Sequence, residues 1–320
     1  MLAKIVKINQ INDLNKIVDS SFNGTCFAYD WFLKLKKVKN ILAIINDKQK
    51  IVAFMPLFIN NDNNRILSQS TMYIPYGGPV IISVPTKERH RIQHIRKLEY
   101  IIGDYLKKNF DDFSFSTDTK IVDIMPFIRM NFVPELRYTY KLNLQKSMED
   151  IYCNFGTDRK KEIKKMIKLG AEFIVDDKLK YFDCKKAMIW EKKHNLPTSV
   201  KFVKKYILES IYQKRGMSFV LKYLGKIIGG VHLVWDKNTA YILYSYYEYS
   251  GAITYIYYNM INYLKCNTTV KYLDFEGSVY ESIEDFNMSF GTYQERYYNL
   301  HWKNSNLYEI YPILYDYGEK

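Results

Sequence analysis

The region from residue 216 to residue 300 constrains the fold most, because it sets out strands and one helix in an order that few architectures accommodate. Apolar, β-branched and aromatic runs separated by turn residues predict strands. One later segment has apolar residues at three- and four-residue steps, which predicts an amphipathic helix. The expected elements are strands at 218–224, 227–235 and 240–247, a helix at 253–264 and a strand at 270–275. A turn at Gly225 and Lys226 makes the first two strands an antiparallel hairpin.

Small residues connect the strand at 240–247 to the helix at 253–264, namely Ser250, Gly251 and Ala252. The first turn of a helix has backbone N–H groups without intrahelical partners, and the helix dipole favours negative charge there. A phosphate-bearing donor molecule therefore fits at this junction.

The chain has 320 residues, 48% of them hydrophobic, which predicts two domains with sizeable cores. Its cysteines have neither disulfide nor metal-ligand spacing, so we expect a reducing, cytoplasmic location and no metal site. We expect no signal peptide and no transmembrane segment, because no apolar run is long enough. The net charge of +13 favours contact with phosphates, nucleic acid or an anionic membrane surface. Alternatively, an AT-rich coding bias spreads lysines over solvated faces.

Two parts of the chain resemble each other in residue pattern and in the expected order of elements. Met-Asn-Phe at 130–132 and Met-Ser-Phe at 288–290 each precede a strand-like segment. Before each of them comes a hairpin, a helix, a short strand and another helix. The sequence therefore predicts two copies of one unit, with domains at 1–145 and 146–320 and a degenerate first copy.

The segment that follows the first copy is expected to be mostly helical, with helices at 158–170, 178–192 and 200–214. Cations crowd one face of the first of these helices, from Arg159 to Lys168. They are candidates for binding the phosphates of a nucleotide-linked acceptor or of RNA. The alternative is an ordinary solvated helix face.

Three motifs together resemble the tandem GNAT acyltransferases, typified by the Fem-type peptidoglycan bridge aminoacyltransferases and the FemAB-like acetyltransferases. Residues 73–80, Tyr-Ile-Pro-Tyr-Gly-Gly-Pro-Val, resemble the family segment Tyr-x-Pro-Arg-Gly-Pro-Val. Residues 141–173 resemble the domain junction, where an Arg-rich helix runs into a Gly-Val strand. Residues 274–278 and 286–291 resemble the closing signature, an acidic strand end followed by Phe-Lys-x-x-Phe-Gly.

The resemblance implies an α/β (α+β) fold of two GNAT-like domains, each a mixed, mainly antiparallel sheet flanked by helices. It also implies an acyl-CoA donor, such as acetyl-CoA, whose pyrophosphate sits on the strand-to-helix loop. The matching residues in this sequence are Tyr247, Ser250, Gly251 and Ala252.

The acceptor is expected in a cleft between the two copies. Tyr76, Gly77 and Gly78 are candidates for contacting it, because glycines beside prolines let a ligand approach the main chain closely. His232 is a further candidate from the middle of a strand. The alternative for His232 is a histidine satisfied within the sheet.

Two departures from the family pattern bear on the donor. Asn287 stands where many Fem-type enzymes carry a lysine near the reacting ester, and Tyr76 with Gly77 replaces the arginine-glycine pair. Some members of the family carry an antiparallel coiled-coil arm. Residues 146–213 of this sequence contain no sustained heptads, so we expect no such arm. These differences favour the simpler acyl-CoA relatives.

N-acyl transfer needs a neutral amine and a protonated leaving group. Glu276 is the candidate base or amine-binding carboxylate, and we expect it and Asp274 to point to opposite faces of a strand end. The alternative is that Glu276 caps the Gly277 turn or pairs with a lysine. Tyr246 is the first candidate for the leaving-group acid, with Tyr247 and Tyr249 beside it; the alternative for each is packing.

The expected function is N-acyl transfer from acyl-CoA to an amine, on an amino sugar or a nucleotide- or lipid-linked cell-envelope precursor. The first alternative is aminoacyl-tRNA-dependent transfer to a peptidoglycan precursor. A second alternative is a non-catalytic protein of the same fold that binds RNA or a membrane surface. Peripheral membrane contact is compatible with the basic charge.

Overall fold

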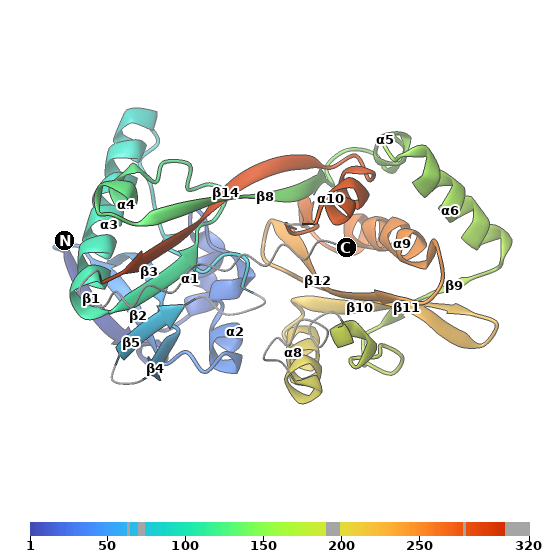
Figure 1. Cartoon of the computed structure of the whole chain (residues 1–320), viewed down its shortest axis with the longest axis horizontal. Helices are drawn as coiled ribbons and strands as arrows, with labels where there is room; N and C mark the ends of the chain where they lie inside the picture. The colour runs from blue at the N-terminus through green and yellow to red at the C-terminus, as the bar shows by residue number, and fades with distance from the viewer. Residues whose placement is uncertain (63–64, 70–73, 190–198, 278–279, 305–320) are drawn as a thin grey trace.

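The computed structural model describes residues 1–62, 65–69, 74–189, 199–277 and 280–304 (Figure 1). They form a four-stranded sheet, β1-β2-β3-β6, and a ten-stranded sheet, β4-β5-β7-β14-β8-β13-β12-β11-β10-β9. All neighbouring strands are antiparallel except β12 with β13 and β5 with β7. The predicted fold class, mainly antiparallel sheets flanked by helices, is confirmed.

The strands are β1 (Leu2–Lys7), β2 (Asn40–Ile45), β3 (Ile51–Pro56), β4 (Ile59–Asp62), β5 (Arg65–Gln69), β6 (Val80–Ile81), β7 (Asp112–Ser116), β8 (Val133–Asn143), β9 (Glu172–Asp176), β10 (Gly216–Tyr223), β11 (Lys226–Trp235), β12 (Thr239–Tyr247), β13 (Tyr272–Asp274) and β14 (Tyr293–Lys303). The helices are α1 (Leu14–Ser20), α2 (Asp30–Leu35), α3 (Glu88–Asn109), α4 (Met125–Arg129), α5 (Met148–Cys153), α6 (Thr157–Lys168), α8 (Val200–Tyr212), α9 (Ala252–Asn267) and α10 (Glu281–Met288), with short 3₁₀ turns η1 (Ile8–Gln10), η2 (Cys26–Ala28) and η3 (Lys186–Met188). Among these described helices, none is long and apolar enough to cross a membrane.

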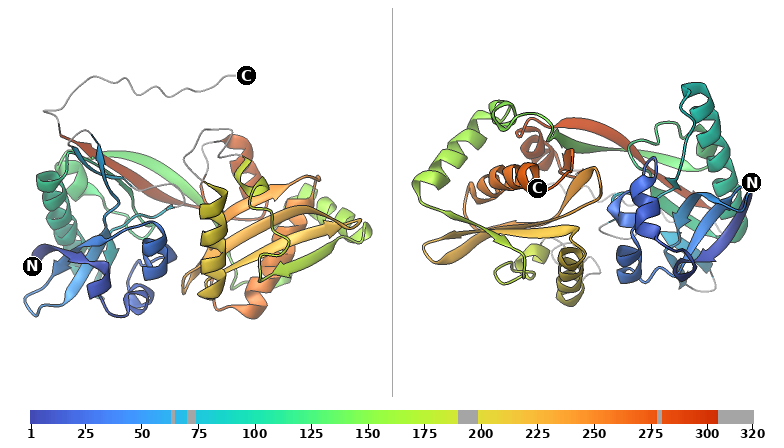
Figure 2. Two further views of the ribbon diagram at one scale, coloured as in Figure 1. Left: turned by 90° about the horizontal axis from the view of Figure 1, so that it is seen from below. Right: turned by 180° about the vertical axis from the view of Figure 1, so that it is seen from behind.

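We call β1 to β7 with α1 to α4 the N-terminal lobe, and α5 to α10 with β9 to β13 the C-terminal lobe. The long strands β8 and β14 lie side by side and bridge the two lobes (Figures 1 and 2). Strand β8 follows the N-terminal lobe in sequence but pairs with β13, and β14 follows the C-terminal lobe but pairs with β7. Each copy therefore contributes its last strand to the sheet of the other.

The predicted internal repeat has a counterpart in this exchange. Asn131 and Gly291 both adopt positive φ, at 66° and 71°, in the turns that lead to β8 and β14. Phe132 and Phe290 beside them are buried in the lobe cores. A boundary at residue 145 leaves β14 hydrogen-bonded to both β7 and β8, so the sheet is continuous across it. The division into domains at 1–145 and 146–320 stays a prediction.

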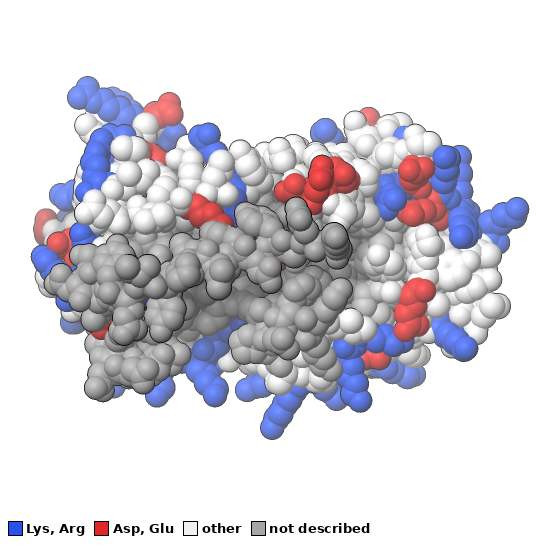
Figure 3. Space-filling model, viewed as in Figure 1, with Lys and Arg blue, Asp and Glu red and all other residues white. Residues whose placement is uncertain are grey.

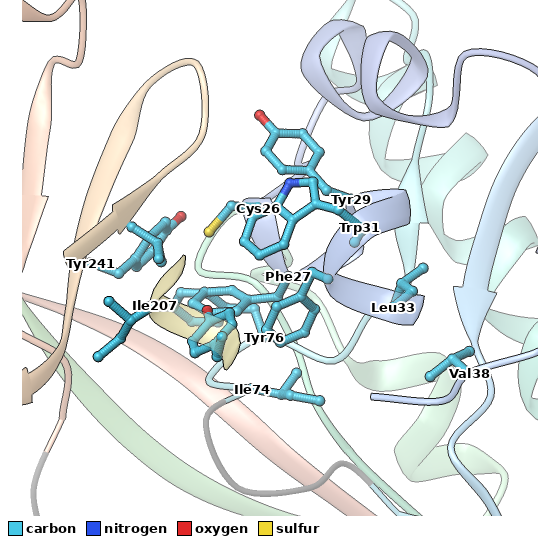
Figure 4. Packing of buried hydrophobic residues seen from close by; sticks show 14 of the residues in the cluster. Cys26, Phe27, Tyr29, Trp31, Leu33, Val38, Ile74, Tyr76, Ile207 and Tyr241 are labelled. Atoms are coloured by element: carbon cyan, nitrogen blue, oxygen red, sulfur yellow. The ribbon is translucent and has the colours of Figure 1, made fainter. Parts of the chain in front are cut away.

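An aromatic core joins the two lobes (Figure 4). The ring of Tyr241 on β12 lies 5.0 Å from that of Phe27 and 6.0 Å from that of Tyr76, between centroids. Trp31 on α2 stacks on Tyr206 of α8 at 5.9 Å. Such pairs contribute roughly 0.5–1.5 kcal/mol each beyond the area they bury, so this core holds the lobes together.

The predicted strands and helix of the central region are confirmed as β10, β11, β12, α9 and β13. The helix expected at 178–192 is wrong over its first part, because residues 178–185 form turns. Asp176 accepts hydrogen bonds from the backbone N–H groups of Lys180, Tyr181 and Phe182, which holds the chain in a loop. Residues 190–198 lie outside the described residues.

The long helix α3 carries a carboxyl group, Glu99, on its buried face. The side chain is fully buried, and neither of its oxygens has a hydrogen-bond partner among the described residues. Burial, and next the charge of Asp123, raise the pKa of Glu99 to about 9, while Arg96 opposes the shift. The folded protein therefore keeps a proton on Glu99 that the unfolded chain loses near its ordinary pKa, so this carboxyl lowers stability progressively from about pH 4.5 to about pH 9.

We expect Glu99→Met to stabilise the protein at pH 8 by about 1–3 kcal/mol, because it removes an unpartnered buried carboxyl at similar volume. The gain should shrink toward pH 5, because the pH then approaches the ordinary pKa of this carboxyl in the unfolded chain and the cost of keeping its proton in the folded protein becomes small. Urea unfolding at the two pH values measures it. Glu88→Met, at an exposed position of the same helix, should stay within about 0.5 kcal/mol of wild type. Equal or lower stability of Glu99→Met at pH 8 contradicts the assignment.

Candidate active site at the lobe junction

Asp274 ends the short strand β13 where the two lobes meet. It pairs across the ladder with Lys141 of β8, so both side chains lie on one face of the sheet. The carboxylate is fully buried and accepts hydrogen bonds from the Thr139 hydroxyl, from the Tyr76 hydroxyl at 2.9 Å and from the Glu276 backbone N–H at 2.8 Å. One carboxylate thus ties β8, β13 and the N-terminal lobe together.

The charge of Asp274 has a cationic partner nearby. Burial raises the pKa of Asp274, while Lys141 and the three hydrogen bonds lower it in part. For Lys141 itself, burial lowers the pKa, but Asp274 and Glu295 outweigh it and the net pKa is raised. Lys141 also donates to Glu295 at 2.6 Å and to the Thr119 hydroxyl at 2.9 Å. The Lys141 ammonium is therefore shared among Asp274, Glu295 and Thr119.

Glu276 follows in a strained turn. Its backbone is left-handed, with φ 62°, and Gly277 comes next because a Cβ there would meet the Tyr138 carbonyl oxygen at 2.2 Å. Strand β13 ends at Asp274, so Glu276 lies in the turn beyond it, and the strand alternation from which we expected opposite faces does not extend to Glu276. A non-glycine residue held in this conformation is a strain that functional sites often carry.

The Glu276 carboxyl lacks a counter-charge among the described residues. Burial, and next Asp274, raise its pKa well above the usual value, and no cation opposes them. Its Oε1 is buried without a hydrogen-bond partner in the described part of the chain, although the residue as a whole is partly exposed. The charge of Glu276 contributes to raising the pKa of the phenols of Tyr206, Tyr257 and Tyr297. The carboxyl is thus set among aromatic rings and open to one more partner.

Near this point, β12 and β13 part. They pair only from Thr239 with Tyr272 to Tyr241 with Asp274, and β12 then continues to Tyr247 paired with β11. The loop after β12 leads into α9, whose N-cap is Gly251 in a left-handed conformation at φ 85°. Tyr247, Ser250 and Gly251 line a pocket of about 400 Å³, and Ala252 is the buried first residue of α9. The predicted donor residues therefore lie together at the start of α9.

The start of α9 already holds a carboxylate of the protein. Glu162 on α6 accepts a hydrogen bond from the Thr254 hydroxyl, in the first turn of α9, at 2.6 Å. Arg159 lies 3.2 Å from the same carboxylate oxygen. The stem of Glu162 also packs against Gly251, whose Cβ would meet the Glu162 Cβ at 3.1 Å. A carboxylate of the protein therefore lies against the first turn of α9.

Two predicted site residues are committed to structural hydrogen bonds. His232 is fully buried, with Ser210 Oγ 3.1 Å from Nε2 and Ser218 Oγ 2.9 Å from Nδ1, and burial lowers its pKa to about 3. This is the histidine satisfied within the sheet that the sequence left as an alternative. Tyr246 accepts a hydrogen bond from the Asp183 backbone N–H at 3.0 Å, and burial raises its pKa to about 12. The environment of Tyr246 is that of a packing residue.

Of the predicted acceptor residues of the first motif, Tyr76 contacts Asp274. Tyr76 donates to it, and the Gly77 backbone N–H donates to the Ser116 carbonyl oxygen at 2.9 Å. Gly78 has φ 126°, which an L-residue rarely adopts. This segment thus reaches the C-terminal lobe through the Tyr76 hydroxyl, a hydrogen bond between residues far apart in sequence.

Sequence reasoning missed Tyr257 and Glu162. Tyr257 on α9 hydrogen bonds Ser245 of β12. Glu276 and Tyr247 both raise the pKa of its phenol electrostatically, so Tyr257 interacts with the turn at Glu276 and with the loop before α9. It belongs to the buried apolar stripe of α9, so its sequence context is that of a packing residue. Glu162 sits among lysines on α6, where its sequence context is that of a solvated helix face.

These features define a class of protein. Two GNAT-like units that exchange their last strands, with a small-residue loop before α9, form the tandem GNAT fold, and the fold is of the FemAB type in particular. No family model matches the sequence.

Solved structures support the assignment of the fold. The crystal structure of FemX is similar over 93% of this chain and 97% of that chain, with a TM-score of 0.67 and 11% identity. The C-terminal domain of a putative lysylphosphatidylglycerol synthetase from Agrobacterium fabrum is similar over 83% of this chain and 85% of that one, with a TM-score of 0.51 and 11% identity. A tandem GNAT protein from the clavulanic acid biosynthesis pathway is similar over 94% and 98%, with a TM-score of 0.51 and 9% identity.

One curated sequence, the β′ subunit of DNA-directed RNA polymerase from Borreliella afzelii (strain PKo), is 29% identical over 119 residues. The match covers 33% of this chain and 8% of that protein.

We expect Tyr76→Phe to cost about 1–3 kcal/mol of stability, because buried Asp274 loses a hydroxyl donor that no water replaces. Urea unfolding at pH 7 measures the loss. Tyr212→Phe, at a side chain that is 81% exposed, is the matched control and should be neutral. A neutral Tyr76→Phe variant contradicts the bond between the lobes.

Proposed function

We propose that the protein is an N-acyltransferase whose acceptor is an amine that binds at Glu276. The observation that carries the proposal is the Glu276 carboxyl, whose buried Oε1 has no hydrogen-bond partner and whose charge has no opposing cation among the described residues. The charge of Glu276 acts on tyrosine phenols of the lobe junction. An ammonium group supplies both the missing charge and the missing donors, and aromatic rings favour cations. The fold, shared with FemX and GNAT acetyltransferases, supports the same reaction class.

Glu276 is the base in this proposal. Burial, and next Asp274, raise its pKa, so its carboxylate is a stronger base than an exposed glutamate. An entering ammonium favours the carboxylate form, and the pair can then pass a proton from nitrogen to Glu276. Asp274 stabilises the turn by accepting a hydrogen bond from the Glu276 backbone N–H. It does not bind the acceptor in this proposal, because its oxygens already accept three hydrogen bonds.

The neutral amine nitrogen attacks the acyl carbonyl carbon of the donor. The new N–C bond forms and the bond from the carbonyl carbon to the leaving group breaks. Glu276 keeps the first proton taken from nitrogen, and the second nitrogen proton, lost as the amide forms, replaces the proton that the leaving group has taken from its acid. We assign the protonation of the leaving group to Tyr257, whose phenol interacts electrostatically with both Glu276 and Tyr247. Its raised pKa, caused first by burial, keeps the phenol protonated until then.

The acceptor class follows from the sequence expectation: an amino sugar or an amino-acid-bearing precursor of the cell envelope, free or linked to a nucleotide or lipid. Acyl-CoA, the donor that the sequence favours, requires the start of α9 to be cleared of Glu162. The aminoacyl-tRNA alternative does not require this. Both donors are made in the cytoplasm, where we propose that the protein acts.

We expect Glu276→Gln to lower turnover by roughly 10²–10⁴-fold, because the amide cannot accept the proton. The assay offers acetyl-CoA or pooled aminoacyl-tRNA as donor and a panel of amino sugars and amino acids as acceptors, and detects the amide by mass spectrometry. Wild-type activity should rise with pH as Glu276 ionises, and the variant should lack this rise.

Glu281→Gln, at an exposed carboxylate of α10, is the matched control and should retain wild-type turnover. Unchanged turnover in Glu276→Gln removes Glu276 as the base. Donor or acceptor binding without any amide product would favour the non-catalytic alternative.

Charge on the surface favours aminoacyl-tRNA as the donor. Lys161, Lys164, Lys165 and Lys168 of α6 are exposed, and cationic side chains gather along this helix at the right edge of Figure 3. The helix adjoins the pocket at the start of α9, because Arg159 and Glu162 line it. Lysines on one exposed helix face are suited to contact successive phosphates of an RNA backbone.

We expect the double variant Lys164→Glu/Lys168→Glu to weaken tRNA binding and to reduce its salt slope by roughly one unit per lost phosphate contact. Filter binding across a salt series measures both. The pair Lys48→Glu/Lys50→Glu makes the same charge change on the β2-β3 turn of the N-terminal lobe and is the control. Equal losses in the two variants would indicate non-specific attraction by net charge only.

A further inference from the structure

We propose that Glu162 determines donor specificity: it occupies the phosphate position at the start of α9 and excludes an acyl-CoA donor from it. The inference rests on the proposed N-acyl transfer and concerns only the donor. It assigns to α6 a role that the sequence left open, because a glutamate among lysines resembles an ordinary solvated residue.

The position of Glu162 is fixed by contacts on three sides. Its Oε2 accepts the Thr254 hydroxyl bond at 2.6 Å and lies 3.2 Å from Arg159. Arg159 is itself held at 3.3 Å from the Thr254 hydroxyl and by stacking over the Phe286 ring at 4.9 Å. Both side chains are mostly covered, with exposures of 18% for Arg159 and 22% for Glu162. A carboxylate at a helix N-terminus satisfies the same dipole that a phosphate would.

The charge of the pocket also opposes a pyrophosphate. Its charged lining residues are Arg159, Glu162 and Glu248, two carboxylates against one guanidinium. Glu248 pairs with Lys186 at 2.6 Å, which lies outside the lining. The one lining cation is engaged by Glu162, so an entering polyphosphate meets like charge before it meets a free donor.

The donor class that remains brings no phosphate to this position. An aminoacyl ester at the end of an RNA fits, because its phosphates can follow the exposed lysines of α6 while the ester lies inward. Glu162 and the lysine face thus divide one helix into a side that repels a small phosphate ligand and a side that attracts a nucleic-acid backbone.

The test is CoA binding by titration calorimetry at low ionic strength, which needs no activity. We expect no detectable binding by wild type at millimolar CoA. Glu162→Gln removes the charge and frees Arg159, so CoA affinity should rise by roughly tenfold or more. The double variant Glu162→Gln/Arg159→Gln should lose this gain. Asp158→Asn is the matched control, because Asp158 lies on the same helix but is 78% exposed.

Thr254→Val tests the same point if Glu162→Gln folds poorly. It removes the hydroxyl that holds Glu162 and should also raise CoA affinity, by less. Tight binding of CoA to wild type, with an unchanged dissociation constant in Glu162→Gln, overturns the inference. A gain in Asp158→Asn equal to that in Glu162→Gln also overturns it, because the effect is then one of net charge.

The CoA-binding experiment and the turnover assay of Glu276→Gln test the two proposals independently. CoA binding by wild type would leave acyl transfer at Glu276 standing with acyl-CoA as donor. Unchanged turnover in Glu276→Gln would remove the proposed base and leave the exclusion of CoA by Glu162 intact.

Discussion

The reciprocal exchange of β8 and β14 is the constraint on which the rest of the structure depends. Each strand leaves its own lobe and completes the sheet of the other, so backbone hydrogen bonds between strands join the lobes along the whole bridge. Separating the lobes would break this ladder of backbone hydrogen bonds, each of which contributes roughly 0.5–1.5 kcal/mol net. The aromatic core around Phe27, Tyr76 and Tyr241 adds apolar burial to the same junction. The site can therefore draw residues from both copies and still hold them at fixed distances.

Asp274 and Glu276 show how one turn gives two carboxyls different roles. Lys141 lies opposite Asp274 in the ladder and offsets its charge, and three hydrogen bonds engage its oxygens. Glu276, two residues on, has none of this compensation among the described residues. A buried carboxylate whose oxygens are engaged and whose charge has a cation nearby is structural, whereas one without these partners needs a partner from outside. The proposed acceptor amine follows from this asymmetry.

The order of the central elements could be predicted, because hairpin turns and the apolar periodicity of α9 are local patterns. The loop before α9 was predicted from its small residues, and its residues do line a pocket. His232 and Tyr246 show the limit of such reasoning. Strand alternation places a side chain on one face of a sheet but does not reveal its hydrogen-bond partners. Ser210 and Ser218 bond the ring nitrogens of His232, and the Asp183 backbone N–H bonds the Tyr246 hydroxyl. The missing helix at 178–185 has a similar cause, since Asp176 captures the backbone N–H groups that a helix would use.

The sequence by itself determined the succession of strands and helices, the repeat, the small-residue junction at Gly251 and the acidic strand end at 274–276. These features depend on side-chain periodicity and turn residues, which are set by neighbours within a few positions of the sequence. Only the tertiary structure decided which strand pairs with which lobe, that Tyr76 bonds Asp274, and that Glu162 enters the first turn of α9. Those contacts join residues roughly a hundred or more positions apart, and their free energy arises only when burial removes competing water.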